Sequence, residues 1–355
     1  MSRVARLLGP LAAFGALAAA IVVTPAFLSD FQAQQAAYVG IYTIALLGLN
    51  VLTGYAGQIS LGHGAFMAVG GYTSAILIAD HGVKDLWTIP VAVAVAGAAG
   101  FLFGVPALRL SGLYLALATF AIAVATPALI KRFEGFTGGG SGKNLFGRPE
   151  LTGSLRPVHV LGYELTFNNW LYYLAWTAAF VAYVVAWLFL RGRVGRALRA
   201  LRDSETAAVS SGISLARYKT LAFGVSAAYA GLAGSLYAIG NTYVNPDTFP
   251  ISLSIFLLVG VVLGGLGSLL GIMAGAVFIY FMPLTWAQSI DSAIPDWLPL
   301  LGNVSTKTPG APAVVFGVVL IALMLALPGG ASGLLARVLG PLTSRRYDRP
   351  SGSRD

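Results

Sequence analysis

The chain has 355 residues, of which 57% are hydrophobic and only 10% are charged, whereas a soluble domain carries about 25% charged residues. Its mean hydropathy of +0.79 also indicates a strongly apolar chain. Too few polar residues are present to cover a soluble globule, the absence of cysteine rules out a disulfide scaffold, and the apolar content rules out a disordered chain. The composition predicts an all-α polytopic membrane protein.

Charge-free intervals locate the spans, because a charged side chain at the centre of a lipid-facing helix costs about 2.5–3.5 kcal/mol. At about 20 residues per span, six of the eight long intervals hold one helix and two hold a pair. We therefore expect about ten transmembrane helices. The single intervals are residues 7–29, 86–108, 110–130, 165–190, 220–246 and 308–336, and the double intervals are 31–79 and 248–290.

The lysines and arginines predict the orientation. An even number of spans puts both termini on one side, and with a cytoplasmic N-terminus most basic residues lie inside, as the positive-inside rule requires. Segment 131–168 is then an outer segment, which its length and composition suit to a small folded element, and 191–219 is a cytoplasmic one. The expected organisation is a transmembrane domain over 1–336 and a basic cytoplasmic tail over 337–355.

The first interval has an alternative interpretation. Arg3 and Arg6 precede an apolar stretch, which is also the pattern of a secretory signal peptide. Because nine further spans follow, we favour an uncleaved first helix.

Each double interval is interrupted by a glycine-rich segment, and the first interruption, 54–64, also carries polar side chains. Irregular backbone at membrane depth survives only where it is buried in protein or lines a wet cavity. A glycine-rich helix contact would explain the glycines but not the polar residues, so we favour a path-lining or re-entrant element over polar residues satisfied in a core. The predicted path residues are Asn50, Thr53, Gln58, Ser60 and His63, and the glycines of the two breaks are Gly54, Gly57, Gly62, Gly64, Gly264, Gly265, Gly267 and Gly271.

Paired interrupted segments indicate a transporter with a substrate path between its halves. No predicted span contains a charged residue, so a proton relay or an ion-coupling carboxylate lacks its usual side chains. A secondary transporter loses support on this ground, although backbone carbonyls could bind an ion. The three histidines lie far apart in sequence with no partner at metal-ligand spacing, so we expect no metal site.

The cytoplasmic segment 191–219 predicts a short helix and a turn. Ser204 suits a helix start, Gly212 suits its end, and Ser214 suits the cap of the next helix. A basic loop attracted to anionic lipid would explain the arginines, but it would not explain a compact turn of small residues with one acid among them. Such a helix fits the groove of a partner protein.

Several sequence blocks resemble a known family. Glu205, Ala207, Ala208 and Gly212 resemble the EAA coupling loop of ATP-binding-cassette importer permeases, which docks into the nucleotide-binding subunit. Five further blocks, in family order, resemble LivM-type branched-chain amino acid permeases. They are residues 48–66, 109–116, 137–139, 219–234 and 264–268.

The outer segment departs from that family pattern. After Thr137-Gly138-Gly139 the chain continues with Gly140-Ser141-Gly142-Lys143-Asn144, where the family often has another glycine and apolar residues. The stretch looks like a phosphate-binding loop, but Thr137 and Asn144 stand where that motif needs glycine and Ser or Thr. We therefore assign any ATP hydrolysis to a separate subunit.

The resemblance implies a permease subunit in the bacterial plasma membrane, with no enzyme activity and no cofactor of its own, that translocates branched-chain or related amino acids. It implies four kinds of partner: a homologous permease, two ABC ATPase subunits that hold ATP and Mg, a solute-binding protein and the lipid bilayer, with no nucleic acid. A urea or amide permease of the same family, a secondary transporter and a passive channel for small polar solutes are the alternatives. In this interpretation Glu205→Arg or Gly212→Arg preserves membrane insertion but abolishes transport-coupled ATP hydrolysis.

Overall fold

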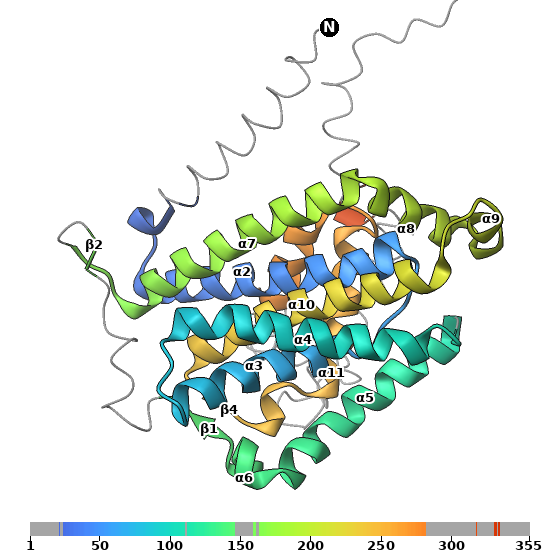
Figure 1. Cartoon of the computed structure of the whole chain (residues 1–355). Coiled ribbons are helices and arrows are strands. Elements are labelled where there is room, and N and C mark those ends of the chain that lie inside the picture. The colour runs from blue at the N-terminus through green and yellow to red at the C-terminus, as the bar shows by residue number, and fades with distance from the viewer. Residues whose placement is uncertain are drawn as a thin grey trace, which may run out of the picture.

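The computed structural model consists mainly of long helices packed side by side (Figure 1). The predicted outermost spans, 7–29 and 308–336, and the tail 337–355 lie almost entirely outside the described residues. The structure describes residues 24–110, 112–145, 159–160 and 163–281, together with the isolated positions 21, 317, 330, 331 and 333.

Within the described residues, 6 helices are long and apolar enough to cross a membrane, and two shorter apolar helices accompany them. The 6 long helices coincide with six of the eight spans predicted between residues 31 and 290, and the two shorter helices lie where the other two are predicted. An all-α membrane protein is thereby confirmed. The total of about ten stays a prediction. The long helices are α2 with its extension η2 (Asp30–Tyr55), α4 (Asp85–Ala107), α5 (Gly112–Arg132), α7 (Phe167–Arg191), α10 (Leu215–Asn241) and α11 (Ile251–Gly264) with the preceding turn η4 (Pro246–Thr248); the short ones are α3 (His63–Ala79) and Gly271–Phe281.

Two helices form the inside of the bundle. The most apolar stretch of α2 is 89% buried and that of α10 is 78% buried, whereas the corresponding stretches of α4, α5 and α7 are 28% buried. The three exposed helices are also the more apolar ones, as expected if lipid rather than water covers them. The bundle is therefore built around α2 and α10, with its most apolar helices outside.

Small residues allow α10 to approach its neighbours closely. A Cβ atom added at Gly70 of α3 would collide with the backbone of Gly231, and one added at Gly234 would collide with the carbonyl of Met67. On the other side, Gly100 of α4 faces Ala227 in the same way. Such contacts are how membrane helices pack when the hydrophobic effect does not drive them together.

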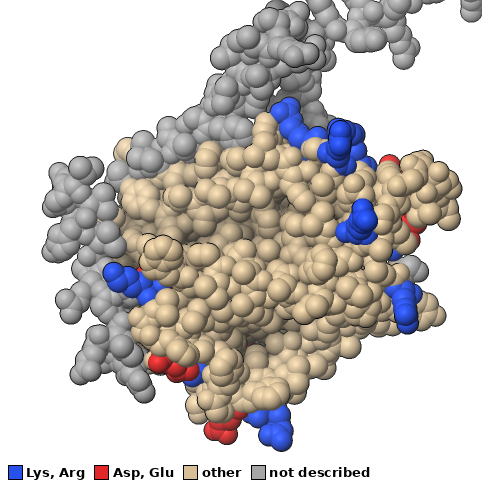
Figure 2. All heavy atoms as spheres, viewed as in Figure 1, with Lys and Arg blue, Asp and Glu red and all other residues tan. Residues whose placement is uncertain are grey.

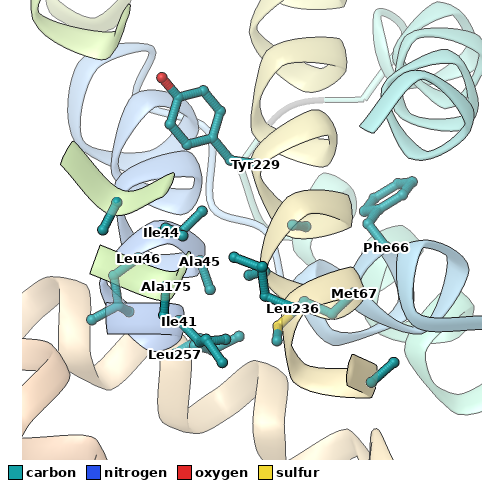
Figure 3. Close-up of a cluster of buried hydrophobic side chains, with 14 of the residues drawn as sticks. Ile41, Ile44, Ala45, Leu46, Phe66, Met67, Ala175, Tyr229, Leu236 and Leu257 are labelled. Atoms are coloured by element: carbon teal, nitrogen blue, oxygen red, sulfur yellow. The ribbon is translucent and has the colours of Figure 1, made fainter. Parts of the chain in front are cut away.

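A large core joins helices from across the bundle (Figure 3). Ile41, Ile44 and Leu46 of α2 lie between Ala175 of α7 and Leu257 of α11. Leu236 of α10 and Met67 of α3 extend the same cluster. Helices that are distant in the chain are thereby held as one body.

Short strands and turns close one end of the bundle. Strand β1 (Lys143–Asn144) pairs antiparallel with β4 (Tyr243–Val244), and Lys143 also forms an ion pair with Asp80. Gly138 adopts a positive φ of 79° at the end of the short helix α6, which makes this glycine-rich stretch a tight turn. The other elements here are η1 (Thr24–Phe27), α6 (Glu134–Thr137), η3 (Gly139–Ser141), and the strand pair β2 (His159–Val160) and β3 (Tyr163–Glu164).

The opposite end carries two further helices, α8 (Arg193–Asp203) and α9 (Glu205–Ser210), and we call it the α9 end (Figure 1). On the face drawn in Figure 2, the charged side chains gather toward the two ends, and a broad band between them holds none. This distribution is that of a protein whose middle lies in hydrocarbon.

Candidate coupling site

The first glycine-rich break is a wide helical turn followed by irregular backbone. Helix α2 passes at Val51 into a π-helix, η2 (Val51–Tyr55), and the next helix begins only at His63. Gly57 lies between them with a φ of 70°. A π-helical turn within an α-helix is rare and is frequently found at functional sites.

The break begins at the α9 end, where η2 ends, and runs back into the bundle to the start of α3 (Figure 1). Gly62 packs against Thr119 of α5, and the His63 ring lies near Ser226, about half-way along α10. The span Asp30–Tyr55 holds 26 residues, which makes it about 39 Å long, more than the hydrocarbon thickness of about 30 Å. The chain therefore completes one crossing before it becomes irregular. That the irregular backbone lies at membrane depth stays a prediction.

The second break occupies the same end. Helix α11 ends at Gly264, Gly265 and Gly267 take φ values of 102° and 78°, and the next helix begins at Gly271. A Cβ atom at Gly264 would lie 2.7 Å from the carbonyl oxygen of Gly271. The two glycines thus let the chain close back on itself in a turn that larger residues would block.

Asn50 binds the two breaks together. Its side-chain amide donates to the carbonyl of Ser268 at 3.1 Å, and its oxygen accepts from the amide of Gly267 at 2.9 Å. The side chain is fully buried, and a Cβ atom at Gly54 would fall within 2.5 Å of the Gly267 nitrogen. The two breaks are thus one structural unit, which we call the junction (residues 50–58 and 264–271).

Helix α8 lies against the junction. Its buried Leu198 and Leu201 face the protein, whereas most of its arginines are exposed. The guanidinium of Arg202 donates to the carbonyl of Gly54 at 2.6 Å, and its aliphatic stem covers Gly57. A charged residue of α8 therefore holds the backbone of the first break directly.

Helix α9 follows α8 as the sequence predicts. The Ser204 hydroxyl accepts from the amide of Ala207 at 3.3 Å, and Gly212 ends the turn with a φ of 80°. Ser214 precedes α10, but its side chain makes no capping hydrogen bond. Ala208 is buried against the protein, whereas Ala207 is exposed.

Glu205, the acidic residue of α9, forms an ion pair within this chain. Glu205 lies 2.6 Å from the ammonium of Lys219, at the beginning of α10, and the Lys219 side chain is 5% exposed. Glu205 therefore fastens α9 to α10, and an arginine there would face a buried lysine. For this reason Glu205→Arg would disturb the fold of this chain as well as any docking.

We predict that Glu205→Gln lowers the stability of the purified protein by about 2 kcal/mol, because it leaves a nearly buried ammonium without its counter-charge. The double variant Glu205→Gln/Lys219→Met should recover most of that loss, since no unpaired charge remains. Thermal unfolding in detergent measures both. Equal stability of Glu205→Gln and the parent would show that solvent already compensates the lysine.

The other predicted path residues mostly shape the first break. The Thr53 hydroxyl donates to the carbonyl of Gln58 at 3.1 Å, and the Ser60 hydroxyl accepts from the amide of Gly62 at 3.3 Å. The His63 ring lies 3.5 Å from the hydroxyl of Ser226. All are buried and bond to other groups of the protein, although the second ring nitrogen of His63 has no partner among the described residues.

Gln58 differs from the others. It is also buried, but neither its side-chain nitrogen nor its oxygen has a hydrogen-bond partner. A buried amide without partners is costly, and in transport proteins such a group is available to water or to a solute.

Sequence reasoning selected Asn50 and Glu205 but missed three residues of this site. Arg202 and Lys219 stood among many basic residues of a cytoplasmic loop, where the positive-inside rule already accounted for them. Val209, the large apolar residue exposed on α9, resembles a core residue when seen in the sequence alone.

An all-α bundle of membrane-length helices with paired glycine interruptions has the architecture of a membrane permease. The family comparison gives the same answer. Residues 33–328 match the family described as branched-chain amino acid transport system / permease component, and the chain belongs to that family.

Individual relatives agree. The chain is 38% identical over 280 residues to the high-affinity branched-chain amino acid transport system permease protein LivM of Salmonella typhimurium, and 37% identical to LivM of Escherichia coli. Each match covers 74% of this chain and 65% of the relative's length. LivH of Escherichia coli is 26% identical over 82% of this chain and 91% of its own. No solved structure matches.

Proposed function

We propose that the chain is the permease subunit of an ATP-binding-cassette importer that translocates branched-chain or related amino acids. Family membership supports this proposal, as do the names of the LivM and LivH relatives, which are branched-chain amino acid transport system permease proteins. The observation that carries the mechanism is the contact chain from α9 through Arg202 to Gly54, Asn50 and the second break.

In this proposal α9 is the part on which an ATPase subunit acts. The described residues of the chain hold no nucleotide-binding loop, so ATP and Mg are held by two separate ATPase subunits on the cytoplasmic side. When these subunits close, motion of α9 passes to α10 through the Glu205–Lys219 pair, and motion of the adjoining α8 passes to the junction through Arg202. The junction then changes the relative tilt of the helices that meet there.

The remaining partners follow from the same proposal. A homologous permease subunit completes the path, a solute-binding protein delivers the amino acid from outside, and the complex lies in the bacterial plasma membrane. The α9 end is then cytoplasmic and the β1–β4 end faces outward, as the positive-inside rule predicts.

The docking surface gives the first test. Val209 is 51% exposed on α9, and no contact within the described residues requires it. We expect Val209→Arg to leave the purified chain folded but to abolish ATPase stimulation and leucine uptake in the assembled complex. Leu113→Arg is the matched control, because Leu113 is another exposed apolar residue at the α9 end, on α5.

Full ATPase stimulation in the Val209→Arg complex would show that α9 is not part of the coupling path.

The same proteoliposomes distinguish the alternative functions. Uptake by this subunit alone, driven by a sodium or proton gradient, would indicate a secondary transporter, and solute flux without ATP would indicate a channel. Selective stimulation by a urea-loaded binding protein would indicate a urea or amide permease.

A further inference from the structure

A cavity of about 540 Å³ opens at the end of the bundle opposite α9. It lies between the outer parts of α2 and α10, the beginning of α11, and the helix Gly271–Phe281. None of the path residues predicted from the sequence lines it. Its volume is in the range of small-molecule sites, which is about 300–1,000 Å³.

Four tyrosines dominate the lining: Tyr38, Tyr42, Tyr237 and Tyr280. The rings of Tyr38 and Tyr280 are stacked with centroids 5.9 Å apart, and Tyr237 meets the Tyr38 ring edge-on at 5.5 Å. Tyr42 lies 6.2 Å from Tyr280. The four side chains come from three separate helices and hold one another in place, which gives the cavity preformed walls.

The charge of the lining is one-sided. Asp247 is the only charged residue among the lining residues, and it is exposed at the mouth. Its nearest cation, Lys131, is 4.0 Å away and itself exposed, so this pair is weak. Aromatic ring faces attract cations, and a carboxylate at the entrance attracts them too. The lining therefore favours an ammonium group.

Other lining residues suit an apolar group and a carboxylate. Leu253, Phe256 and Ile279 line the cavity and provide apolar contact area. Tyrosine hydroxyls and the Ser252 side chain are hydrogen-bond donors that suit a carboxylate. The Asn241 amide donates to the Tyr243 carbonyl and has a second N–H to offer. Ammonium, carboxylate and an apolar side chain together describe a zwitterionic amino acid.

We propose that this cavity is the outer solute-receiving site of the permease and that its tyrosines hold a zwitterionic amino acid by its ammonium group. The inference rests on the proposed import function and adds to it a site that lies far from the junction. Solute recognition and coupling are then separate in this chain: the tyrosine cavity receives the solute, and the junction transmits the motion.

The test compares solute handling with ATP hydrolysis in the assembled complex in proteoliposomes, with leucine as the probe. We expect Tyr42→Ala to lower leucine uptake about tenfold, whereas ATPase stimulation by the leucine-loaded binding protein changes by less than about twofold. Tyr42→Phe should keep most of the uptake, because the ring face remains. Tyr114→Ala is the control, since Tyr114 is an exposed tyrosine of α5 outside the cavity.

A second measurement covers the case in which Tyr42→Ala fails to assemble. The chain has no cysteine, so Ser252→Cys places one reactive thiol in the cavity. We expect a bulky membrane-impermeant maleimide to stop leucine uptake in this variant. The same reagent should leave uptake intact in Ser141→Cys, an exposed position at the same end of the bundle that does not line the cavity.

The outcomes distinguish this inference from the proposed function. A parent complex that shows no ATP-dependent leucine uptake would contradict the import function itself. A parent that transports leucine, with unchanged uptake in Tyr42→Ala or in maleimide-treated Ser252→Cys, would overturn the cavity assignment only. Parallel loss of uptake and ATPase stimulation in an assembled Tyr42→Ala complex would likewise overturn it, because a purely structural role of Tyr42 would then explain both losses.

Discussion

The variant Gly54→Ala is expected to lose transport and about 3 kcal/mol of stability. A Cβ atom at this position would overlap the side-chain oxygen of Asn50 and lie 2.5 Å from the Gly267 nitrogen. Overpacking of a tight site costs about 1–3 kcal/mol, and displacing Asn50 breaks its two buried hydrogen bonds at about 1 kcal/mol each. The methyl group added by Gly54→Ala would therefore push apart the two breaks that Asn50 joins.

Thermal unfolding of the purified protein and leucine uptake by the assembled complex measure the two effects. Gly40→Ala is the matched control, because Gly40 lies on the same helix and a Cβ atom there would meet its neighbours at an ordinary 3.5 Å. Parent-like stability and uptake in Gly54→Ala would mean that the junction adapts to the methyl group, and Asn50 would then lose its bridging role.

Arg202→Ala is expected to uncouple ATP hydrolysis from transport while the fold remains intact. The side chain is 44% exposed, so its removal leaves no buried charge, but its hydrogen bond to the Gly54 carbonyl is lost. A hydrogen bond to a charged group contributes about 1.5–3 kcal/mol, which corresponds to a shift of about 10- to 100-fold in a conformational equilibrium. Leucine uptake per ATP hydrolysed should fall by a factor in that range.

Arg196→Ala provides the control, since Arg196 is an exposed arginine of the same helix whose side chain has no hydrogen-bond or ion-pair partner among the described residues. Arg202→Lys should recover part of the coupling, because the charge is kept but the planar guanidinium is not. If uptake per ATP were the same in Arg202→Ala and in the parent, motion of α9 would have to reach the bundle by another route, for which the Glu205–Lys219 pair is the available contact.

The predicted spans succeeded for a local reason. Whether a residue tolerates hydrocarbon depends mainly on its own side chain, so charge-free intervals such as 31–79 and 248–290 mark helices without any knowledge of packing. The cap of α9 at Ser204 and the turn after it at Gly212 are also local, since a cap and a positive φ involve only a few neighbouring residues. Such features can be predicted from the sequence alone.

The candidate site was predicted only in pieces. Asn50 and the glycines of both breaks were selected separately, but nothing in their spacing indicates that Asn50 bonds to residues 217 and 218 positions away. Arg202 and Lys219 could not be separated from the other basic residues of the loop, because the contacts that distinguish them are made by helices distant in the chain. Gln58 and His63 are both buried, but only His63 lies within hydrogen-bond distance of a partner, the Ser226 hydroxyl, and the sequence does not show this difference.

The sequence therefore suffices for features that depend on a residue and its near neighbours. These are the membrane class, the span positions, the glycine interruptions and the small helix that projects from the bundle. Tertiary structure decides which of these features meet. It joins the two breaks through Asn50, places Arg202 on the first of them, and gathers four tyrosines from three helices around one cavity. The physical reason is that transfer of a side chain into lipid is a property of that residue, whereas a hydrogen bond or a cavity wall depends on where the rest of the chain has folded.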